Sequence, residues 1–196
     1  MKSNSVLEEV SDEMASVVEK ARRSVVQILD DGGGRGAGTV WHRDGLILTN
    51  AHVVRDRTIR VSLDDGRVMD ARVVAVSKEY DLAALVVEAR DLPAIPLGDS
   101  RKVVPGEIVL AVGHPWGRVG AATSGIAIGL ESHEGSEREW LAVNMQLRPG
   151  NSGGPLLDRE GRLIGINTIM SGPNVGLAVP SHVAKSFLNR ELKAAA

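Results

Sequence analysis

The sequence contains no cysteine, so neither a disulfide framework nor a thiolate metal site can form. Aromatic residues are scarce, with three tryptophans, one phenylalanine and one tyrosine. No apolar run approaches the ~20 residues that a membrane-spanning helix needs. The net charge is only −2 at pH 7, which offers no electrostatic basis for binding nucleic acid or an anionic membrane. These absences disfavour disulfide-rich, membrane-spanning and nucleic-acid-binding classes.

Short apolar segments rich in valine and isoleucine fill most of the 196 residues. Examples are GLILTN, LAALVV and EIVLAV, and turn sequences such as RDG, DDG and PG separate them. This density of short strands is typical of an all-β sandwich or barrel. The proline-containing stretch DLPAIPLGDSRKVVPG divides the strands into halves of about six each. The pattern therefore predicts two barrels packed together.

Both ends of the chain carry helical patterns. Apolar residues recur at helical spacing from Val6 to Val25, and Ser181 is a plausible N-cap for a closing helix. We expect an N-terminal amphipathic helix in 1–23, a first barrel in 24–100, a second barrel in 101–180, and a helix and tail in 181–196. The acidic N-terminal segment is not a secretory signal. The expected location is cytoplasmic if the chain is complete, and extracytoplasmic or periplasmic if a leader was removed.

The stretch GNSGGPLL places Ser152 between glycines, either as a nucleophile or as the polar residue of a turn. A serine hydroxyl reacts only when a base takes its proton and a third group orients that base. His52 follows the strand-like GLILTN, and Asp81 directly precedes the strand-like LAALVV. The order His52, Asp81, Ser152 places the first two in the first half and the serine in the second. The remaining histidines are expected to be structural: His42, His114, His133 and His182.

The same stretch also satisfies G-x-S-x-G, the nucleophile elbow of α/β-hydrolases. Asp158 and His182 follow Ser152 in the order that this alternative requires. The elbow also needs a helix directly after the serine. Here two glycines, Pro155 and a strand-like PLL follow instead, so the sequence disfavours the elbow.

Eight motifs occur in one order between about Ser24 and His182: TNAHVV, YDLAAL, LGDS, GHPWG, TSGIAIGL, RPGNSGGPLLD, RLIGINT and GLAVP. Together they resemble the protease domain of the HtrA/Deg family of trypsin-like serine proteases. The resemblance implies two six-stranded antiparallel barrels with Ser152 as nucleophile, His52 as base and Asp81 as orienting group. It implies an oxyanion hole formed by the N–H groups of Gly150 and Ser152. Neither a metal nor a cofactor is expected.

The resemblance also implies ATP-independent cleavage of unfolded or misfolded proteins after small or medium aliphatic residues. Leu147 would lie near the floor of the specificity pocket, although ordinary core is its other interpretation. Ile166, Asn167 and Thr168 would pair with the substrate backbone. A homotrimer is implied as well, yet no aromatic residue precedes Trp41, where family members carry aromatics for that contact.

Two departures from the family pattern precede the serine. Asn144 replaces a usual acidic residue and Arg148 replaces a usual asparagine, which leaves the resting state of this loop open. A catalytically silent holdase or binding module on the same fold is therefore the alternative. An interaction module that uses the N-terminal helix is a third. No PDZ domain follows the closing helix, so we expect a single-domain relative or an excised protease domain.

Overall fold

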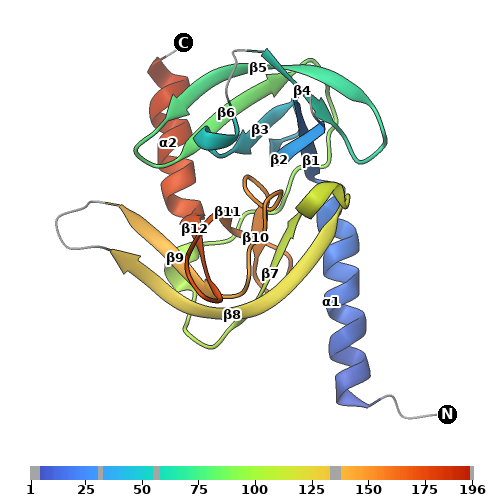
Figure 1. Cartoon of the computed structure of the whole chain (residues 1–196), viewed down its shortest axis with the longest axis vertical. Coiled ribbons are helices and arrows are strands. Elements are labelled where there is room, and N and C mark those ends of the chain that lie inside the picture. The colour runs from blue at the N-terminus through green and yellow to red at the C-terminus, as the bar shows by residue number, and fades with distance from the viewer. Residues whose placement is uncertain (1–4, 31–32, 55–57, 133–137, 195–196) are drawn as a thin grey trace.

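Two closed antiparallel barrels make up most of the molecule (Figure 1). The computed structural model describes residues 5–30, 33–54, 58–132 and 138–194. His133 and the outermost residues of both expected terminal segments lie outside this part. The six-stranded barrels, with one helix at each end of the chain, confirm the predicted fold class.

The first barrel closes in the order β1-β2-β3-β6-β5-β4. Its strands are β1 (Val25–Asp30), β2 (Gly33–His42), β3 (Leu46–Thr49), β4 (Thr58–Ser62), β5 (Val68–Ser77) and β6 (Leu82–Val87). The second barrel closes in the order β10-β11-β12-β9-β8-β7. Its strands are β7 (Ile108–Gly113), β8 (Ala121–Ser132), β9 (Glu139–Asn144), β10 (Pro155–Leu157), β11 (Leu163–Gly172) and β12 (Val175–Pro180).

Strand β6 shows why so many segments are apolar without alternation. Successive side chains of a strand point to opposite faces. Leu85 and Val87 enter the interior of the first barrel, whereas Leu82 and Ala84 belong to a second cluster between the barrels. Both faces of β6 therefore pack against apolar clusters, which explains why LAALVV contains no polar residue.

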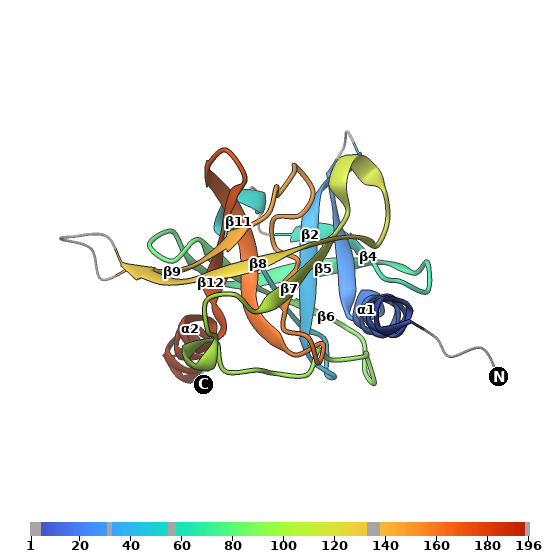
Figure 2. The ribbon, with the colours of Figure 1, turned by 90° about the horizontal axis from the view of Figure 1, so that it is seen from below.

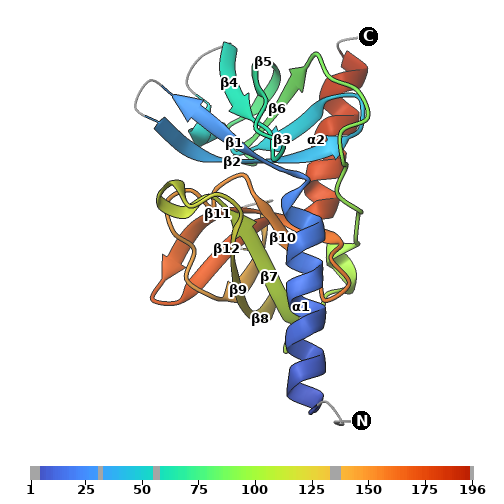
Figure 3. The ribbon, with the colours of Figure 1, turned by 90° about the vertical axis from the view of Figure 1, so that its right-hand side faces the viewer.

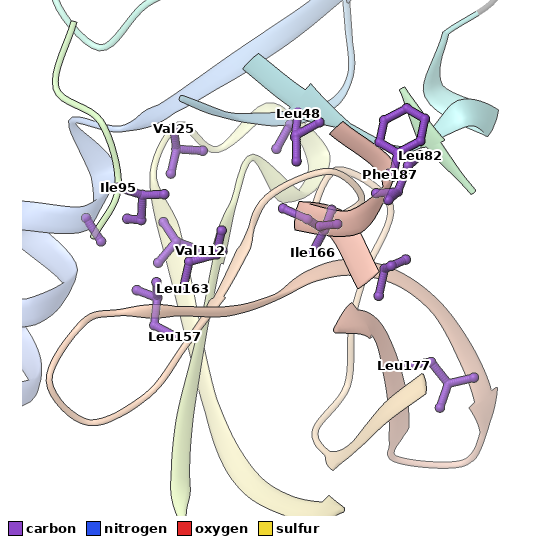
Figure 4. Packing of buried hydrophobic residues seen from close by; sticks show 14 of the residues in the cluster. Val25, Leu48, Leu82, Ile95, Val112, Leu157, Leu163, Ile166, Leu177 and Phe187 are labelled. Atoms are coloured by element: carbon purple, nitrogen blue, oxygen red, sulfur yellow. The ribbon is translucent and has the colours of Figure 1, made fainter. Parts of the chain in front are cut away.

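The layer between the barrels is a continuous apolar core (Figure 4). Leu48 and Leu82 approach from the first barrel, and Val112 and Ile166 from the second. Phe187 of the C-terminal helix, 1% exposed, inserts into the same cluster. The contact that brings the barrel edges together is thus packed like a domain interior.

Helix α1 (Val6–Arg22) begins with a capping box in which Ser5 and Glu8 bond each other's backbone N–H. Only its C-terminal half packs on the body, through the buried Ala21 and the partly buried Val17. The N-terminal half projects past the second barrel, and Leu7 is 80% exposed (Figure 3). No helix among the described residues is long and apolar enough to cross a membrane.

Helix α2 (Ser181–Ala194) starts directly after β12 and lies on a different flank from α1 (Figure 2). Ser181 is its first helical residue rather than the residue before it. The Ser181 hydroxyl donates to the Gly98 carbonyl and accepts from the Ser100 N–H. It therefore ties the helix to the segment that connects the two barrels.

Candidate active site

His52 lies at the edge of the first barrel. Strand β3 ends at Thr49, and the single 3₁₀ turn Ala51–Val53 follows it. Val53 is buried and anchors this turn, while the His52 side chain is 46% exposed. Asn50 is buried, and its side-chain amide donates to the Asp81 carbonyl at 3.0 Å. This hydrogen bond joins the segment that carries His52 to the segment that carries Asp81.

Asp81 lies in the left-handed region, with φ of 51°, directly before β6. Its carboxylate accepts from the His52 backbone N–H at 3.0 Å, from His52 Nδ1 at 2.8 Å and from the Thr168 hydroxyl at 2.5 Å. Burial raises the pKa of the Asp81 carboxyl, but the bonds from the His52 imidazole, the Thr168 hydroxyl and the His52 N–H outweigh it. The pKa lies below its ordinary value, so the group is ionised at neutral pH.

Ser152 lies in a tight turn that leads into β10. The turn is bonded to the first barrel, because the Ala37 N–H donates to the Ser152 carbonyl at 2.8 Å and the Thr39 hydroxyl to the Gly153 carbonyl at 3.0 Å. Gly153 has φ of 85°, and a Cβ there would lie 2.0 Å from the Ala37 carbonyl oxygen. A glycine is required for the two barrels to approach this closely. A strand follows the serine, whereas the nucleophile elbow needs a helix.

One hydrogen-bonded chain joins the three sequence-predicted residues across the barrels. The Ser152 hydroxyl donates to the Thr168 carbonyl at 2.9 Å, and the Thr168 hydroxyl donates to Asp81, which holds His52. The serine makes no hydrogen bond to His52 in the described structure; its hydroxyl points to Thr168 instead. With Nδ1 facing the carboxylate, the Nε2 edge of the imidazole is left for a reaction partner.

The Pro149–Gly150 peptide has a defined orientation. The Pro149 carbonyl accepts from the Trp116 N–H at 3.2 Å, and the Gly150 carbonyl from the His114 N–H at 2.9 Å. Because C=O and N–H point in opposite directions in a trans peptide, the Gly150 N–H faces away from Trp116. Neither this N–H nor that of Ser152 donates to any residue that the structure describes. Two donors therefore stand unpaired beside the serine.

The expected substrate-binding residues occupy different depths. Leu147 is 7% exposed and packs against Gly176, where a Cβ would lie 2.9 Å from Leu147 Cγ. Ile166 is fully buried, and Asn167 is too, with its backbone N–H and C=O bonded to Gly154 and Gly153. The backbone N–H and C=O of Asn167 are therefore not free for a substrate strand.

Thr168 is different, because it lies at a bulge between Asn167 and Ile169 in the pairing of β11 with β12. Its carbonyl faces Ser152 and its hydroxyl faces Asp81. The neighbouring Ile169 is 47% exposed. Sequence reasoning grouped Thr168 with substrate contacts and missed its bond to Asp81, since nothing local links two residues 87 positions apart.

The other described histidines are engaged elsewhere. His42 lies on the surface near Asp44. Burial lowers the pKa of the His114 imidazole, whose Nδ1 accepts from the Gly120 N–H. His182 bonds Ser100 and Glu139.

No metal centre is suggested by the described residues, which form no group of three or more histidine or carboxylate side chains suited to hold an ion.

Comparison with known proteins agrees with this geometry. Residues 36–166 match the family model of the trypsin-like peptidase domain. The chain is 37% identical to the serine protease HhoB of Synechocystis, over 78% of this chain and 39% of HhoB. It is 38% identical to the mitochondrial serine protease HTRA2 of Bos taurus, over 90% of this chain and 43% of HTRA2. The chain thus spans about two fifths of these relatives.

Solved structures give the same result. The HtrA-type protease AlgW with a decapeptide superposes with a TM-score of 0.83 at 28% identity, covering 91% of this chain and 67% of AlgW. AlgW with a tripeptide gives a TM-score of 0.82 at 32% identity, over 89% of this chain and 62% of AlgW. The chain therefore belongs to the trypsin-like peptidase family and, within it, to the HtrA-type serine proteases.

Proposed function

We propose that this chain is a serine endopeptidase in which Ser152, His52 and Asp81 form the catalytic triad. The observation that supports it most is the bonded chain from His52 through Asp81 and Thr168 to Ser152. The ionised Asp81 fixes a proton on Nδ1, which leaves Nε2 able to accept one. A rotation about the Ser152 Cα–Cβ bond transfers its hydroxyl from the Thr168 carbonyl toward Nε2.

The acyl step then follows from these positions. The Ser152 oxygen attacks the peptide carbonyl while its proton passes to His52, and His52 returns that proton to the leaving amine. The unpaired N–H groups of Gly150 and Ser152 supply the oxyanion hole. Each such donor contributes about 3 kcal/mol of transition-state stabilisation. Water deacylates Ser152 by the same proton route, and no step needs ATP.

The substrates that we propose are unfolded polypeptides cleaved after small or medium aliphatic residues. Leu147 lies against Gly176, and its N–H donates to the Met170 sulfur at 3.1 Å. Leu147 is an aliphatic side chain at this position, and residues 144–150 contain no carboxylate to bind a basic side chain. AlgW was solved with a decapeptide and with a tripeptide, which supports a polypeptide as the ligand class.

Cleavage of an unfolded protein such as β-casein tests the proposal. Wild type should produce fragments without ATP, and Ser152→Ala should produce none while keeping the wild-type circular dichroism and unfolding midpoint. Ser124→Ala, an exposed serine on β8, is the matched control and should cleave normally. Fragmentation by Ser152→Ala would refute the assigned nucleophile. If wild type suppresses casein aggregation without cutting it, the holdase alternative is correct.

A further inference from the structure

The segments that border the serine turn beside Gly150 form a basic rim. Three segments reach the serine turn there, namely 35–37, 114–120 and 145–150, joined to it by bonds or by the chain itself. They contain Arg35, Arg118 and Arg148 and no aspartate or glutamate. The whole chain has a net charge of −2, so these three arginines are a local excess of basic residues in the segments beside the serine turn. A cleft rim of one sign favours ligands of the other.

Arg148 is a member of this rim that lies over an aromatic ring. Its guanidinium carbon lies 4.7 Å from the centroid of the Trp116 ring, and that tryptophan is 65% exposed. Trp116 has φ of 51°, which an aromatic residue seldom adopts, and its N–H donates to Pro149. A guanidinium over a ring face keeps its N–H donors available at its edge, in the fork that suits a carboxylate.

Some exposed arginines of this chain pair with a carboxylate, but Arg148 pairs with none that the structure describes. Arg101 pairs with Asp99, and Arg159 with Glu160, at 3.0 Å in each case. Arg148 forms no ion pair with any residue in the part of the chain that the structure describes. Its donors are therefore available to a carboxylate from another molecule.

The position of Arg148 relative to the scissile bond follows from the sheet order. Strand β10, which the serine turn enters, lies between β11 and β7. Thr168 on β11 borders the turn on one side, and the segment after β7, with Trp116, borders it on the other. A substrate whose acyl half lies along β11 therefore carries its leaving-group half past Trp116 and Arg148.

We propose that Arg148, stacked on Trp116, binds an acidic side chain of the substrate on the leaving-group side of the scissile bond. The chain then cleaves preferentially before acidic sequence. This inference rests on the proposed endopeptidase function and adds a specificity determinant to it. Trp116 acts through Arg148, as the residue that orients the guanidinium.

Paired quenched fluorescent peptides measure this preference directly. The two members of a pair differ only by glutamate or glutamine at one of the first three positions after the scissile bond. For wild type at low ionic strength, we expect kcat/KM to favour glutamate about fivefold at one or more of these positions, as for a charge-assisted bond at an exposed site. The ratio should fall as salt is added, because exposed charges are screened.

Substitutions then assign the effect to Arg148. The glutamate-to-glutamine ratio should drop to about one in Arg148→Gln. It should be intermediate in Arg148→Lys, which keeps the charge but loses the planar stack. Trp116→Leu should also lower the glutamate-to-glutamine ratio. Arg159→Gln removes an exposed arginine remote from the cleft and should keep the wild-type ratio.

Two results would overturn the proposal. One is a wild-type ratio near one at all three positions. The other is an unchanged ratio in Arg148→Gln, including the case in which both peptides slow equally, which would make Arg148 a support of its loop only. Failure of the endopeptidase function looks different, because wild type would then cleave neither peptide of any pair.

Discussion

At the scale of single residues, the Asp81 carboxylate accepts hydrogen bonds from donors on both barrels. Thr168→Val removes the hydroxyl that contacts Asp81 Oδ2 and leaves a side chain of equal size. A hydrogen bond to a charged group contributes about 1.5–3 kcal/mol, so kcat/KM should fall at least about tenfold. Steady-state kinetics on one peptide measures this, and Thr168→Ser, which keeps the hydroxyl, should retain most activity.

The same substitution has a pH signature. The pKa of Asp81 is lower in the folded state than its ordinary value, so its stabilisation is full above the unfolded pKa and is lost as pH falls through the folded pKa. Without the Thr168 donor the folded pKa rises, and acid destabilisation should begin at a higher pH than in wild type. Urea unfolding across acidic pH measures the shift. An identical pH profile for both proteins would show that Thr168 does not influence the carboxylate.

The roles of individual residues were predictable from sequence to different extents. His52, Asp81 and Ser152 were identifiable because each lies beside a strand end in a recognisable motif. The structure brings them into one network, while their catalytic roles stay predictions. The bond between Thr168 and Asp81 and the stacking of Arg148 on Trp116 were not predictable, since they depend on how two barrels dock.

At the scale of elements, the serine turn can lie close against β2 because Gly153 has no side chain. Gly153→Ala would place Cβ 2.0 Å from the Ala37 carbonyl and 2.2 Å from the Thr49 hydroxyl. Gly66 is a matched control, because its φ of 86° nearly equals the 85° of Gly153 and nothing lies within 4 Å of a Cβ there. Gly66→Ala should lower the free energy of unfolding by about 1–2 kcal/mol, the cost of a left-handed backbone conformation for alanine.

Gly153→Ala should lower the free energy of unfolding by more, about 3 kcal/mol or above, because the turn must shift away from β2. The shift should also abolish peptide hydrolysis. Urea unfolding and peptide hydrolysis measure the two effects. Equal losses in stability for Gly153→Ala and Gly66→Ala would contradict the close docking of turn and strand.

Element types followed from sequence more readily than element contacts. Runs such as LAALVV predict strands by composition, but only the docked barrels explain why both faces are apolar. The predicted pairing of Ile166 and Asn167 with the substrate backbone shows that sequence indicates a strand but not its hydrogen-bond partners. Their strand was recognisable, yet the backbone partners that occupy Asn167 come from the serine turn.

At the scale of the whole molecule, the inter-barrel core makes the two barrels one cooperative unit. Phe187 of α2 lies in the same cluster as residues of both barrels. Phe187→Ala should therefore lower the unfolding free energy by about 3–5 kcal/mol. Trp41 on β2 and Trp140 on β9 report on the separate barrels, and single-tryptophan variants should show coincident transitions. Separate transitions would mean that segments 24–100 and 101–180 unfold independently.

The assembly of the molecule is a further prediction at this scale. The resemblance implies a homotrimer, but α1 contains no aromatic residue for that contact, and its apolar side chains Val6 and Leu7 are 74% and 80% exposed. Sedimentation equilibrium distinguishes a trimer from a monomer.

The measurement that addresses the central claim most directly is labelling of the folded protein with a fluorophosphonate, followed by mass spectrometry of its peptides. The probe reacts with a serine only when a base and an oxyanion hole are assembled around it. The account predicts one adduct, confined to Ser152 and absent in His52→Ala. Labelling of another residue, or no labelling of well-folded protein, would contradict it.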